Sequence, residues 1–321
     1  MADRYDVVIV GAGAAGSEAA FAIAGLPGWS GAIGPGKSRR VLLVESSHLG
    51  GTCTNEGCVP TKALVRAARV LHLARSSADL GLRIGSVSFD WGAVTSRMRE
   101  VRDHQLRFGT APFEEAGIEV RFPARATFAG PRSISVDGDL VEARSVVIAV
   151  GLRPAVPPIP GLAEAGCLDN ESALDLRALP RSLAVLGGGP IGCEFAQIFA
   201  RFGVEVTVVE ALERLLPPEE PESSAELLKA FSAEGISTRL GAKVAAVSGS
   251  GPGRPKRLTF ESGPELEVDE ILVAAGRQLD GAALGLDPAG IRWSRKGIEA
   301  DRSLRASADW AFVAGDVAGG P

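Results

Sequence analysis

The sequence predicts an α/β protein built from two doubly wound, Rossmann-like domains, because one pattern occurs twice in 321 residues. The pattern is a short apolar strand, a glycine-rich turn of the form G-x-G-x-x-G, a helix-forming stretch, and a second strand that ends in glutamate. Its first copy spans residues 7–45 and its second copy residues 183–210. One glycine-rich turn is a weak signal, whereas two complete copies are difficult to obtain by chance. A chain of this length also commonly folds as two domains.

The first copy predicts a nucleotide site near the N-terminus. Its turn lets the backbone approach a pyrophosphate at the N-terminus of the following helix. The strand 41–44 then ends at a carboxylate that can bind a ribose hydroxyl. The interval before this carboxylate is longer than the usual ~20 residues, and the excess falls in a Gly/Pro-rich stretch, 25–37, that we expect to be a surface loop. The candidate residues are Gly11, Gly13, Ala14, Ala15, Gly16 and Glu45.

The second copy predicts a second nucleotide site. It comprises a strand over 183–186, a helix over 193–202 and a strand over 204–209. The terminal glutamate prefers the free 2′-hydroxyl of NAD, so the sequence favours NAD over NADP. We expect Cys193, just after the turn, to be a small buried residue. The candidate residues are Gly187, Gly188, Gly189, Pro190, Ile191, Gly192 and Glu210.

Composition argues against several classes of partner. The net charge is −5 and the basic residues are scattered, which disfavours a nucleic-acid or anionic-membrane partner. No apolar run reaches the ~18 residues of a membrane span. Residues 1–6 lead directly into the first strand without the features of a signal peptide, so we expect a cytoplasmic protein. The three histidines show no paired spacing, and no metal site is predicted.

Two cysteines stand five positions apart in Gly50–Lys62, whose sequence is GGTCTNEGCVPTK. The second, Cys58, opens a predicted helix, because proline is tolerated in a first turn and residues 63–74 are apolar at helical spacing. In a regular helix five residues rise ~7.5 Å, beyond the ~4.4–6.8 Å between the Cα atoms of a disulfide. A bridge from Cys53 to Cys58 therefore requires an irregular first turn, which Gly57 permits.

The residues alone leave three interpretations of this pair open. The helix N-terminus and nearby Lys62 would favour the thiolate of Cys58, as in a redox pair. A structural disulfide and half of a metal site are the alternatives. A structural disulfide is disfavoured because the chain is expected to be cytosolic. A zinc site with four thiolates needs a second cysteine pair, whereas Cys167 and Cys193 are isolated in the sequence.

The segment Gly50–Lys62 resembles the redox motif of the FAD-dependent pyridine nucleotide-disulfide oxidoreductases, which include dihydrolipoamide dehydrogenase, mercuric reductase and glutathione reductase. The resemblance implies that the first nucleotide is FAD, that Cys58 lies against the flavin as a thiolate, and that Cys53 exchanges with substrate. It also implies that Lys62 lies near the flavin and pairs with Glu194. Gly51 and Thr52 would belong to the FAD site.

Further segments match the family with some departures. Residues 146–154 resemble its "ATGSxP" strand end, with Val150 in the usual Thr place, and residues 271–277 its "VAxGR" strand, followed by Gln278-Leu279-Asp280 in place of the common x-Pro-Asn. Pro190 stands where relatives often carry a bulky gate over the nicotinamide. The resemblance assigns the FAD adenine to Ala126, the FAD site to Gly151, the NAD site to Val244 and Gly276, and a ribityl hydroxyl to Asp316.

These matches predict an FAD domain over 1–154 with the redox pair, an NAD domain over 155–279 that interrupts it, and a return segment of the FAD domain over 280–321. Within the first domain, 90–115 is expected to be an amphipathic helix. Residues 118–122, 126–128 and 133–136 are expected to form a β-meander.

The expected function is electron transfer between NAD(H), FAD and the Cys53–Cys58 disulfide, with a small dithiol or disulfide, or a lipoyl group on a partner protein, as substrate. The alternatives are a mercuric reductase-like enzyme and an FAD/NAD module with diaphorase activity only. Family members continue into a dimerisation domain whose His-x4-Glu pair supplies a base, and the resemblance covers about their first two thirds. We therefore expect either a fragment of a homodimeric enzyme or a shortened protein.

Overall fold

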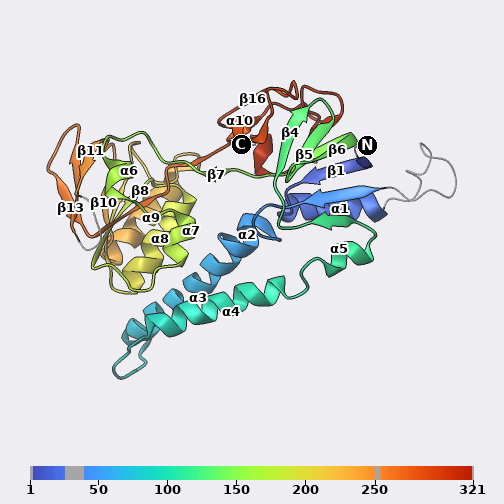
Figure 1. Ribbon diagram of the computed structural model, residues 1–321. Helices are drawn as coiled ribbons and strands as arrows, with labels where there is room; N and C mark the ends of the chain where they lie inside the picture. Colours follow the sequence, from blue (N-terminus) through green and yellow to red (C-terminus); the bar gives the residue numbers. More distant parts are fainter. Residues whose placement is uncertain (1–2, 26–39, 250–253, 320–321) are drawn as a thin grey trace. The chain divides into compact units, whose positions relative to one another are not determined.

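The computed structural model describes residues 3–25, 40–249 and 254–319, and it divides into two compact units (Figure 1). Unit 1 comprises residues 1–55, 103–153 and 277–321, and unit 2 comprises 56–102 and 154–276. The chain passes from unit 1 to unit 2 after residue 153 and back after residue 276, close to both expected domain boundaries. Residues 56–102, however, belong to unit 2 and not to the unit that contains the rest of the expected FAD domain. The domain boundaries themselves stay predictions. The expected surface loop lies, apart from Gly25, outside the described residues.

Unit 1 is built on a mostly parallel sheet in the order β3-β2-β1-β6, with β18 paired to the end of β6 (Figure 1). All four residues of β2 are buried, as expected for a strand covered on both faces. Helix α1 lies between β1 and β2 in the order of elements along the chain. The elements are β1 (Asp3–Val10), α1 (Ala14–Gly25), β2 (Val41–Val44), α2 (Gly51–Asn55), α5 (Ala111–Glu115), β3 (Glu119–Arg121), β6 (Asp139–Ile148), α10 (Gly281–Leu284), β16 (Trp293–Ser294), β17 (Gly297–Ile298), β18 (Ala311–Val313) and η3 (Asp316–Ala318).

The β-meander of unit 1 differs from the prediction in one strand. The first half of β6 pairs antiparallel with β5 (Ser133–Val136), which pairs antiparallel with β4 (Ala126–Gly130). The expected strand over 118–122 forms β3 instead, and it pairs parallel with β2. Ile118, the residue before β3, is buried with Ile9 and Leu43 in one hydrophobic cluster of the parallel strands. Alternating polarity indicated a strand here, but it carries no information about the partner strand.

Unit 2 contains a second parallel sheet, in the order β10-β9-β8-β14, and a three-stranded antiparallel sheet β11-β12-β13. Two parallel sheets with helical crossovers confirm the predicted doubly wound α/β fold. The helix and both strands of the second sequence copy form α8, β8 and β9. The elements are α3 (Cys58–Arg75), η2 (Ser77–Leu80), α6 (Leu162–Ala165), α7 (Asn170–Leu174), β8 (Ser182–Leu186), α8 (Pro190–Arg201), β9 (Glu205–Val209), α9 (Pro221–Ala233), β10 (Ser237–Arg239), β11 (Val244–Ser248), β12 (Lys256–Phe260), β13 (Leu266–Val268) and β14 (Glu270–Val273).

Three further elements lie where the chain passes between the units: α4 (Trp91–Leu106), β7 (Arg153–Pro154) and β15 (Arg277–Gln278). The single helix expected over 90–115 is two helices, α4 and α5. Gly109, with a φ of 54°, lies in the turn between them, and this left-handed conformation ends helical geometry without steric cost for glycine. Across the described ranges, no helix combines the length and apolarity needed to cross a membrane.

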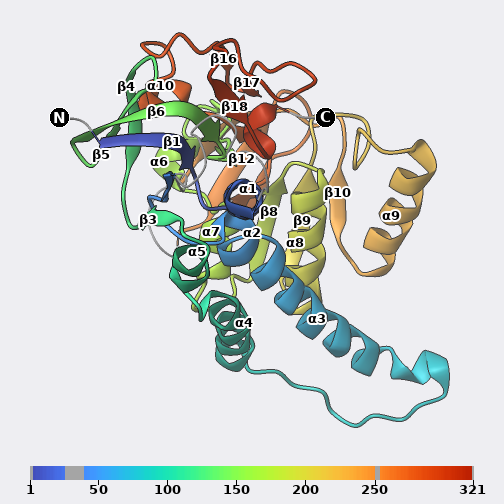
Figure 2. The same ribbon diagram turned by 90° about the vertical axis from the view of Figure 1, so that its right-hand side faces the viewer.

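Helices α3 and α8 pack together in unit 2 through an apolar interface (Figures 1 and 2). On α3, Leu64 and Ala68 are buried, and on α8, Phe195 and Phe199 are buried in the same cluster. These positions are spaced four residues apart on each helix, so they form one face of each. The packing fixes the side chains of α3 relative to the second glycine-rich turn, which begins α8.

A partly buried ion pair joins the C-terminal end of α8 to the residue that follows α9. The guanidinium of Arg201 donates to both carboxylate oxygens of Glu234 at 2.7 Å, and Gln197 adds a third donor at 2.8 Å. Burial by itself would raise the pKa of the Glu234 carboxyl, but the hydrogen bonds and charge of Arg201 outweigh it and hold that pKa below its ordinary value. The pair therefore stabilises the fold when Glu234 is ionised.

We predict that Glu234→Gln lowers the free energy of unfolding by ~1–3 kcal/mol at pH 7, because it leaves Arg201 with a neutral partner. A depressed folded-state pKa stabilises the protein above the unfolded value of ~4.3, and this contribution disappears as pH falls through the folded value. Urea unfolding at pH 7 and at acidic pH should show that the difference in unfolding free energy between Glu234→Gln and the unsubstituted protein is smaller at acidic pH. Glu226→Gln, in an exposed pair with Lys229, is the matched control and should change stability by under ~1 kcal/mol.

Candidate functional site

The first glycine-rich turn is held by backbone contacts that exclude side chains. A Cβ atom on Gly16 would lie 1.9 Å from the carbonyl oxygen of Gly11, so α1 can only approach β1 this closely with glycine. Gly51, which begins α2, is equally close to the turn: its Cβ would lie 2.6 Å from the Cα of Gly13. The amide of Gly50 donates to the Ala12 carbonyl at 2.9 Å. The start of the segment Gly50–Lys62, called the redox segment below, thus lies in direct contact with the first turn.

Both strand-end glutamates bind their own glycine-rich turn. Glu45 is buried and accepts hydrogen bonds from the amide of Ala12 at 2.8 Å and of Ser47 at 2.8 Å. Glu210 repeats this geometry, accepting from the amide of Gly188 at 2.6 Å and of Leu212 at 2.8 Å. Each carboxylate is therefore fixed beside the turn that would hold a nucleotide phosphate. The sequence spacing predicted both positions, but not these amide contacts.

Other predicted FAD-site residues surround the first turn within unit 1. A Cβ on Gly315 would lie 2.9 Å from the Cβ of Ala15, which places the residue preceding Asp316 against the start of α1. A Cβ on Gly11 would lie 2.5 Å from the carbonyl oxygen of Ala149, two residues before Gly151. The amide of Ala124 donates to the Glu45 carbonyl at 2.7 Å, two residues before Ala126 at the start of β4.

Asp316 is held by an arginine that sequence reasoning had not singled out. The guanidinium of Arg277 forms an ion pair with the Asp316 carboxylate and also donates to the Leu152 carbonyl. Both contacts lie within unit 1. The arginine stands in the segment that matches the family's "VAxGR" strand, so the motif was the available signal, but nothing in it named Asp316 as the partner.

The second turn has the same construction in unit 2. A Cβ on Gly192 would lie 2.0 Å from the carbonyl oxygen of Gly187, and one on Gly187 would lie 2.4 Å from that of Ala274, two residues before Gly276. The amide of Ala242 donates to the Glu210 carbonyl at 2.9 Å, which brings the strand that begins at Val244 close to this carboxylate. The predicted NAD-site residues thus converge on one turn.

Cys193 is the small buried residue that was expected. Its thiol donates to the carbonyl of Gly188 at 3.3 Å. Burial, with a smaller contribution from the Glu210 charge, raises the pKa of this thiol to about 11. Cys193 is therefore protonated near neutral pH and is a poor nucleophile.

The two turns suit dinucleotide phosphates. The first-turn amides of a helix have no acceptor within the helix, and the helix dipole favours an anion there. Neither α1 nor α8 carries an acidic residue in its first turn, so no carboxylate competes for these amides. Helix α8 begins with Pro190 after an extended Gly189, as expected for proline at the first helical position. Ile191, the next residue, is partly exposed.

The redox segment bends at the expected residue. Cys53 lies in α2 and is half-buried beside Thr52, whereas Cys58 is the exposed first residue of α3. Gly57 separates the helices with a φ of −131° and a ψ of −110°, far from helical values. The required irregularity before Cys58 is therefore present.

Asn55 lies inside the segment Gly50–Lys62, and its sequence position alone indicated no role for it. It is buried, and its side-chain amide donates to the carbonyls of Leu49 and Gly51 at 2.9 Å each. These bonds close the short helix α2 over the residues that contact the first turn. Its place inside the motif was the only sequence signal.

Lys62 and Glu194 form the ion pair that the resemblance implied, between α3 and α8 in unit 2. The side chains are 63% and 31% exposed, so solvent screens the pair and it contributes little to stability. Glu194 follows Cys193 near the start of α8. The pair thus connects α3, which begins at Cys58, to α8, which begins in the second turn.

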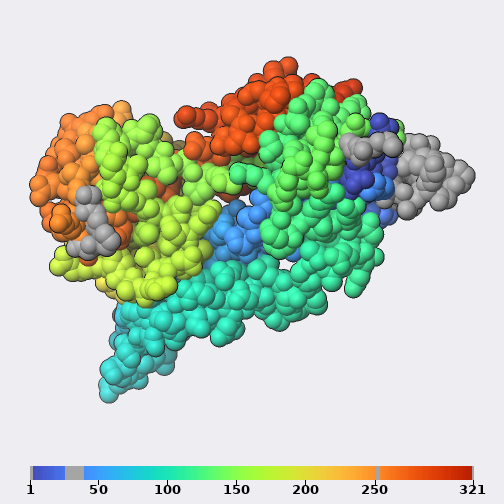
Figure 3. Space-filling view, viewed as in Figure 1, coloured from blue at the N-terminus to red at the C-terminus, as the bar shows by residue number. Residues whose placement is uncertain are grey.

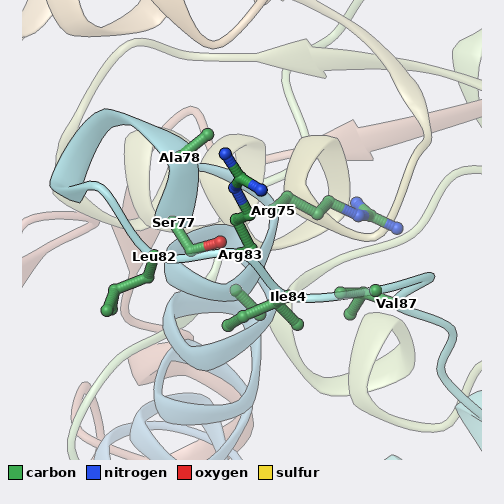
Figure 4. Close-up of a pocket in the computed structure, with 9 residues that line it drawn as sticks. Arg75, Ser77, Ala78, Leu82, Arg83, Ile84 and Val87 are labelled. Carbon is green, nitrogen blue, oxygen red and sulfur yellow. The ribbon is translucent and has the colours of Figure 1, made fainter.

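A separate hollow of about 380 Å³ lies at the end of α3. The segment 78–90 beside it lies on the surface (Figure 3). Arg75 and Arg83 stand on its rim with Leu82, Ile84 and Val87 (Figure 4). None of the predicted site residues lines it. Over the residues that the structure describes, no three His, Cys, Asp or Glu side chains are grouped as metal ligands.

The comparison with protein families decides the assignment. Residues 5–321 match the family model described as pyridine nucleotide-disulphide oxidoreductase. The chain belongs to this family. FAD and NAD are therefore its cofactors, and the residues around both turns fit the nucleotides of these oxidoreductases. The roles of the individual residues stay predictions.

Relatives of the oxidoreductase family carry two different names. The chain is 36% identical to dihydrolipoyl dehydrogenase of Chlorobaculum tepidum, over 100% of this chain and 67% of the relative. It is 32% identical to mercuric reductase of Staphylococcus aureus, over 99% of this chain and 56% of the relative. The flavoprotein disulfide reductase RclA of Escherichia coli superposes with a TM-score of 0.82 at 32% identity, covering 99% of this chain and 67% of that one. The chain thus spans about two thirds of the dihydrolipoyl dehydrogenase and of RclA, and a smaller share of the mercuric reductase.

We predict that Gly16→Ala destabilises this oxidoreductase by ~3 kcal/mol, because the new methyl group meets the immobile Gly11 carbonyl. Purified Gly16→Ala protein should also contain far less FAD than the unsubstituted protein. Urea unfolding of FAD-free protein and flavin absorbance measure the two effects. Gly25→Ala, at the end of the same helix and with no atom within 4 Å of the new Cβ, should match the unsubstituted protein in both.

Proposed function

We propose that the chain carries the electron-transfer half of an FAD-dependent disulfide oxidoreductase of the dihydrolipoyl dehydrogenase type. The observation that carries the proposal is the backbone contact between Gly51 and Gly13, because it joins the redox segment to the first nucleotide turn. Cys53 follows two residues later in α2. We infer that the cysteine pair, which follows this contact in the chain, exchanges electrons with a flavin held at this turn.

The proposed reaction moves two electrons. In one direction, NADH, a proton and a disulfide give NAD⁺ and a dithiol, and a dithiol substrate drives the reverse direction with NAD⁺ as acceptor. FAD and NAD would supply the hydride chemistry when bound. Cys53 exchanges with the substrate thiol, and Cys58, exposed at the start of α3, holds the thiolate. Lys62 places positive charge beside this thiolate, and Glu194 holds the lysine in place.

The proposed substrate is a small dithiol or disulfide, or a lipoyl group on a partner protein. Glu210 supports NAD, since its fixed carboxylate would repel a 2′-phosphate. A second candidate is reduction of mercuric ion by the reduced cysteine pair, which the likeness to the staphylococcal mercuric reductase supports.

We predict that anaerobic NADH titration of the FAD-loaded protein produces a long-wavelength charge-transfer band. Cys58→Ser should abolish it, whereas Cys53→Ser should show it before any reductant is added, because Cys58 then has no disulfide partner. Cys193→Ser, which alters a protonated buried thiol, should behave like the unsubstituted protein.

A flavin-loaded protein with no such band would contradict the proposed electron relay from NADH through FAD to the cysteine pair. The chain would then be an FAD/NAD module with diaphorase activity only. If the band forms, NAD⁺-dependent oxidation of dihydrolipoamide and NADH-dependent loss of mercuric ion distinguish the two substrate candidates. The same titration with NADPH tests the preference assigned to Glu210.

We predict that Lys62→Met slows NADH-driven flavin reduction at least ~10-fold, because it removes the positive charge beside the thiolate. Stability should change by under ~1 kcal/mol, since the ion pair is exposed. Stopped-flow absorbance measures the rate and urea unfolding the stability. Lys229→Met, in the exposed pair of α9, should leave the rate unchanged. Equal rates in both variants would remove Lys62 from the mechanism.

A further inference from the structure

A side chain of α7 contacts the bend of the redox segment within unit 2. The side-chain amide of Asn170 donates to the backbone carbonyl of Glu56 at 3.0 Å. Glu56 precedes Gly57, whose backbone breaks the helical path, and Cys58 follows. A carbonyl oxygen only accepts hydrogen bonds, so the amide nitrogen and not its oxygen must face it.

Asn170 is itself held at a fixed position. It is the first residue of α7, and Asp169 and Ser172 form a capping box around it, with bonds of 2.8 and 2.9 Å. The preceding Leu168 exchanges backbone hydrogen bonds of 2.7 Å with Ile271 and Val273 of β14. The donor is therefore mounted on the edge of the parallel sheet that carries the second turn.

We propose that Asn170 is a positioning residue for Cys58, an inference that rests on the proposed function of the cysteine pair. The peptide between Glu56 and Gly57 immediately precedes the one whose Gly57 carbonyl accepts the first helical bond of α3, from the Thr61 amide at 3.0 Å. Its orientation therefore sets the direction in which α3 starts. Glycine permits several orientations of this peptide. The Asn170 amide selects one of them and so fixes where the Cys58 sulfur lies.

The inference also links the two halves of the relay. Backbone hydrogen bonds join β14 to Leu168, and two residues further along the chain Asn170 donates to the bend before Cys58. The carbonyl of Ala274, which follows β14, meets Gly187 of the second turn. The backbone that shapes the proposed NAD site therefore also holds the peptide that orients the thiolate.

The test compares Asn170→Ala and the isosteric Asn170→Asp with Ser172→Ala. Both Asn170 variants remove the donor, and the second places a carboxylate against the Glu56 carbonyl. Ser172→Ala weakens the helix cap but leaves the donor. Losing one hydrogen bond changes the population of the selected orientation by ~5-fold. The charge-transfer band of NADH-reduced, FAD-loaded protein should therefore weaken at least ~2-fold in both Asn170 variants, with a shifted pH midpoint.

The second readout needs no flavin. In reduced, FAD-free protein, the rate of Cys58 alkylation by iodoacetamide, followed by mass spectrometry of its peptide, should change in both Asn170 variants and not in Ser172→Ala. If the band and the alkylation rate of all three variants equal those of the unsubstituted protein, or if Ser172→Ala reproduces the Asn170 effects, the positioning role is wrong. A protein without any band, but with Asn170-dependent alkylation, would instead overturn the proposed relay and leave the positioning of Cys58 standing.

Discussion

The close approach of a helix to a strand at each glycine-rich turn is the constraint on which both nucleotide sites depend. At Gly16 and at Gly192 an added Cβ would lie 1.9 and 2.0 Å from a carbonyl oxygen of the same turn. Only glycine allows this geometry, which aims the first amides of α1 and α8 at the space beyond the strand ends. The strand-end glutamates then bind turn amides that lie outside the helices. One piece of backbone in each unit thus shapes the proposed sites for phosphate and ribose.

The same constraint explains why the redox segment starts with two glycines. Gly50 and Gly51 have φ values of 84° and 58°, and Gly51 lies against Gly13 with no room for a side chain. A bulkier residue would push α2 away from the first turn. Asn55 then holds α2 closed through two backbone carbonyls. The motif is therefore mostly a set of steric and hydrogen-bonding requirements placed around two cysteines.

Sequence patterns predicted what depends on local chain geometry. The two strand–turn–helix copies, the terminal glutamates, the helix that begins at Cys58 and the buried Cys193 depend on neighbouring residues, and the structure has them where expected. Partners distant in sequence left no such signal. Asn170 and Glu56 are 114 positions apart, and Arg277 and Asp316 are 39 apart. The alternating polarity of residues 118–122 likewise predicted a strand but did not indicate that β2 is its partner. The Lys62–Glu194 contact was the exception, and it came from the family resemblance.

The helical rise explains why the bend before Cys58 needs support from outside the segment. Five residues of regular helix separate two Cα atoms by more than a disulfide can span, so the chain must leave helical geometry between Cys53 and Cys58. The structure places that departure at Gly57, the residue with the fewest steric restrictions. A glycine that permits the bend cannot by itself specify it. Specification must come from hydrogen bonds outside the glycine: Asn55 fixes the short helix before the bend, and Asn170 holds the Glu56 carbonyl at it.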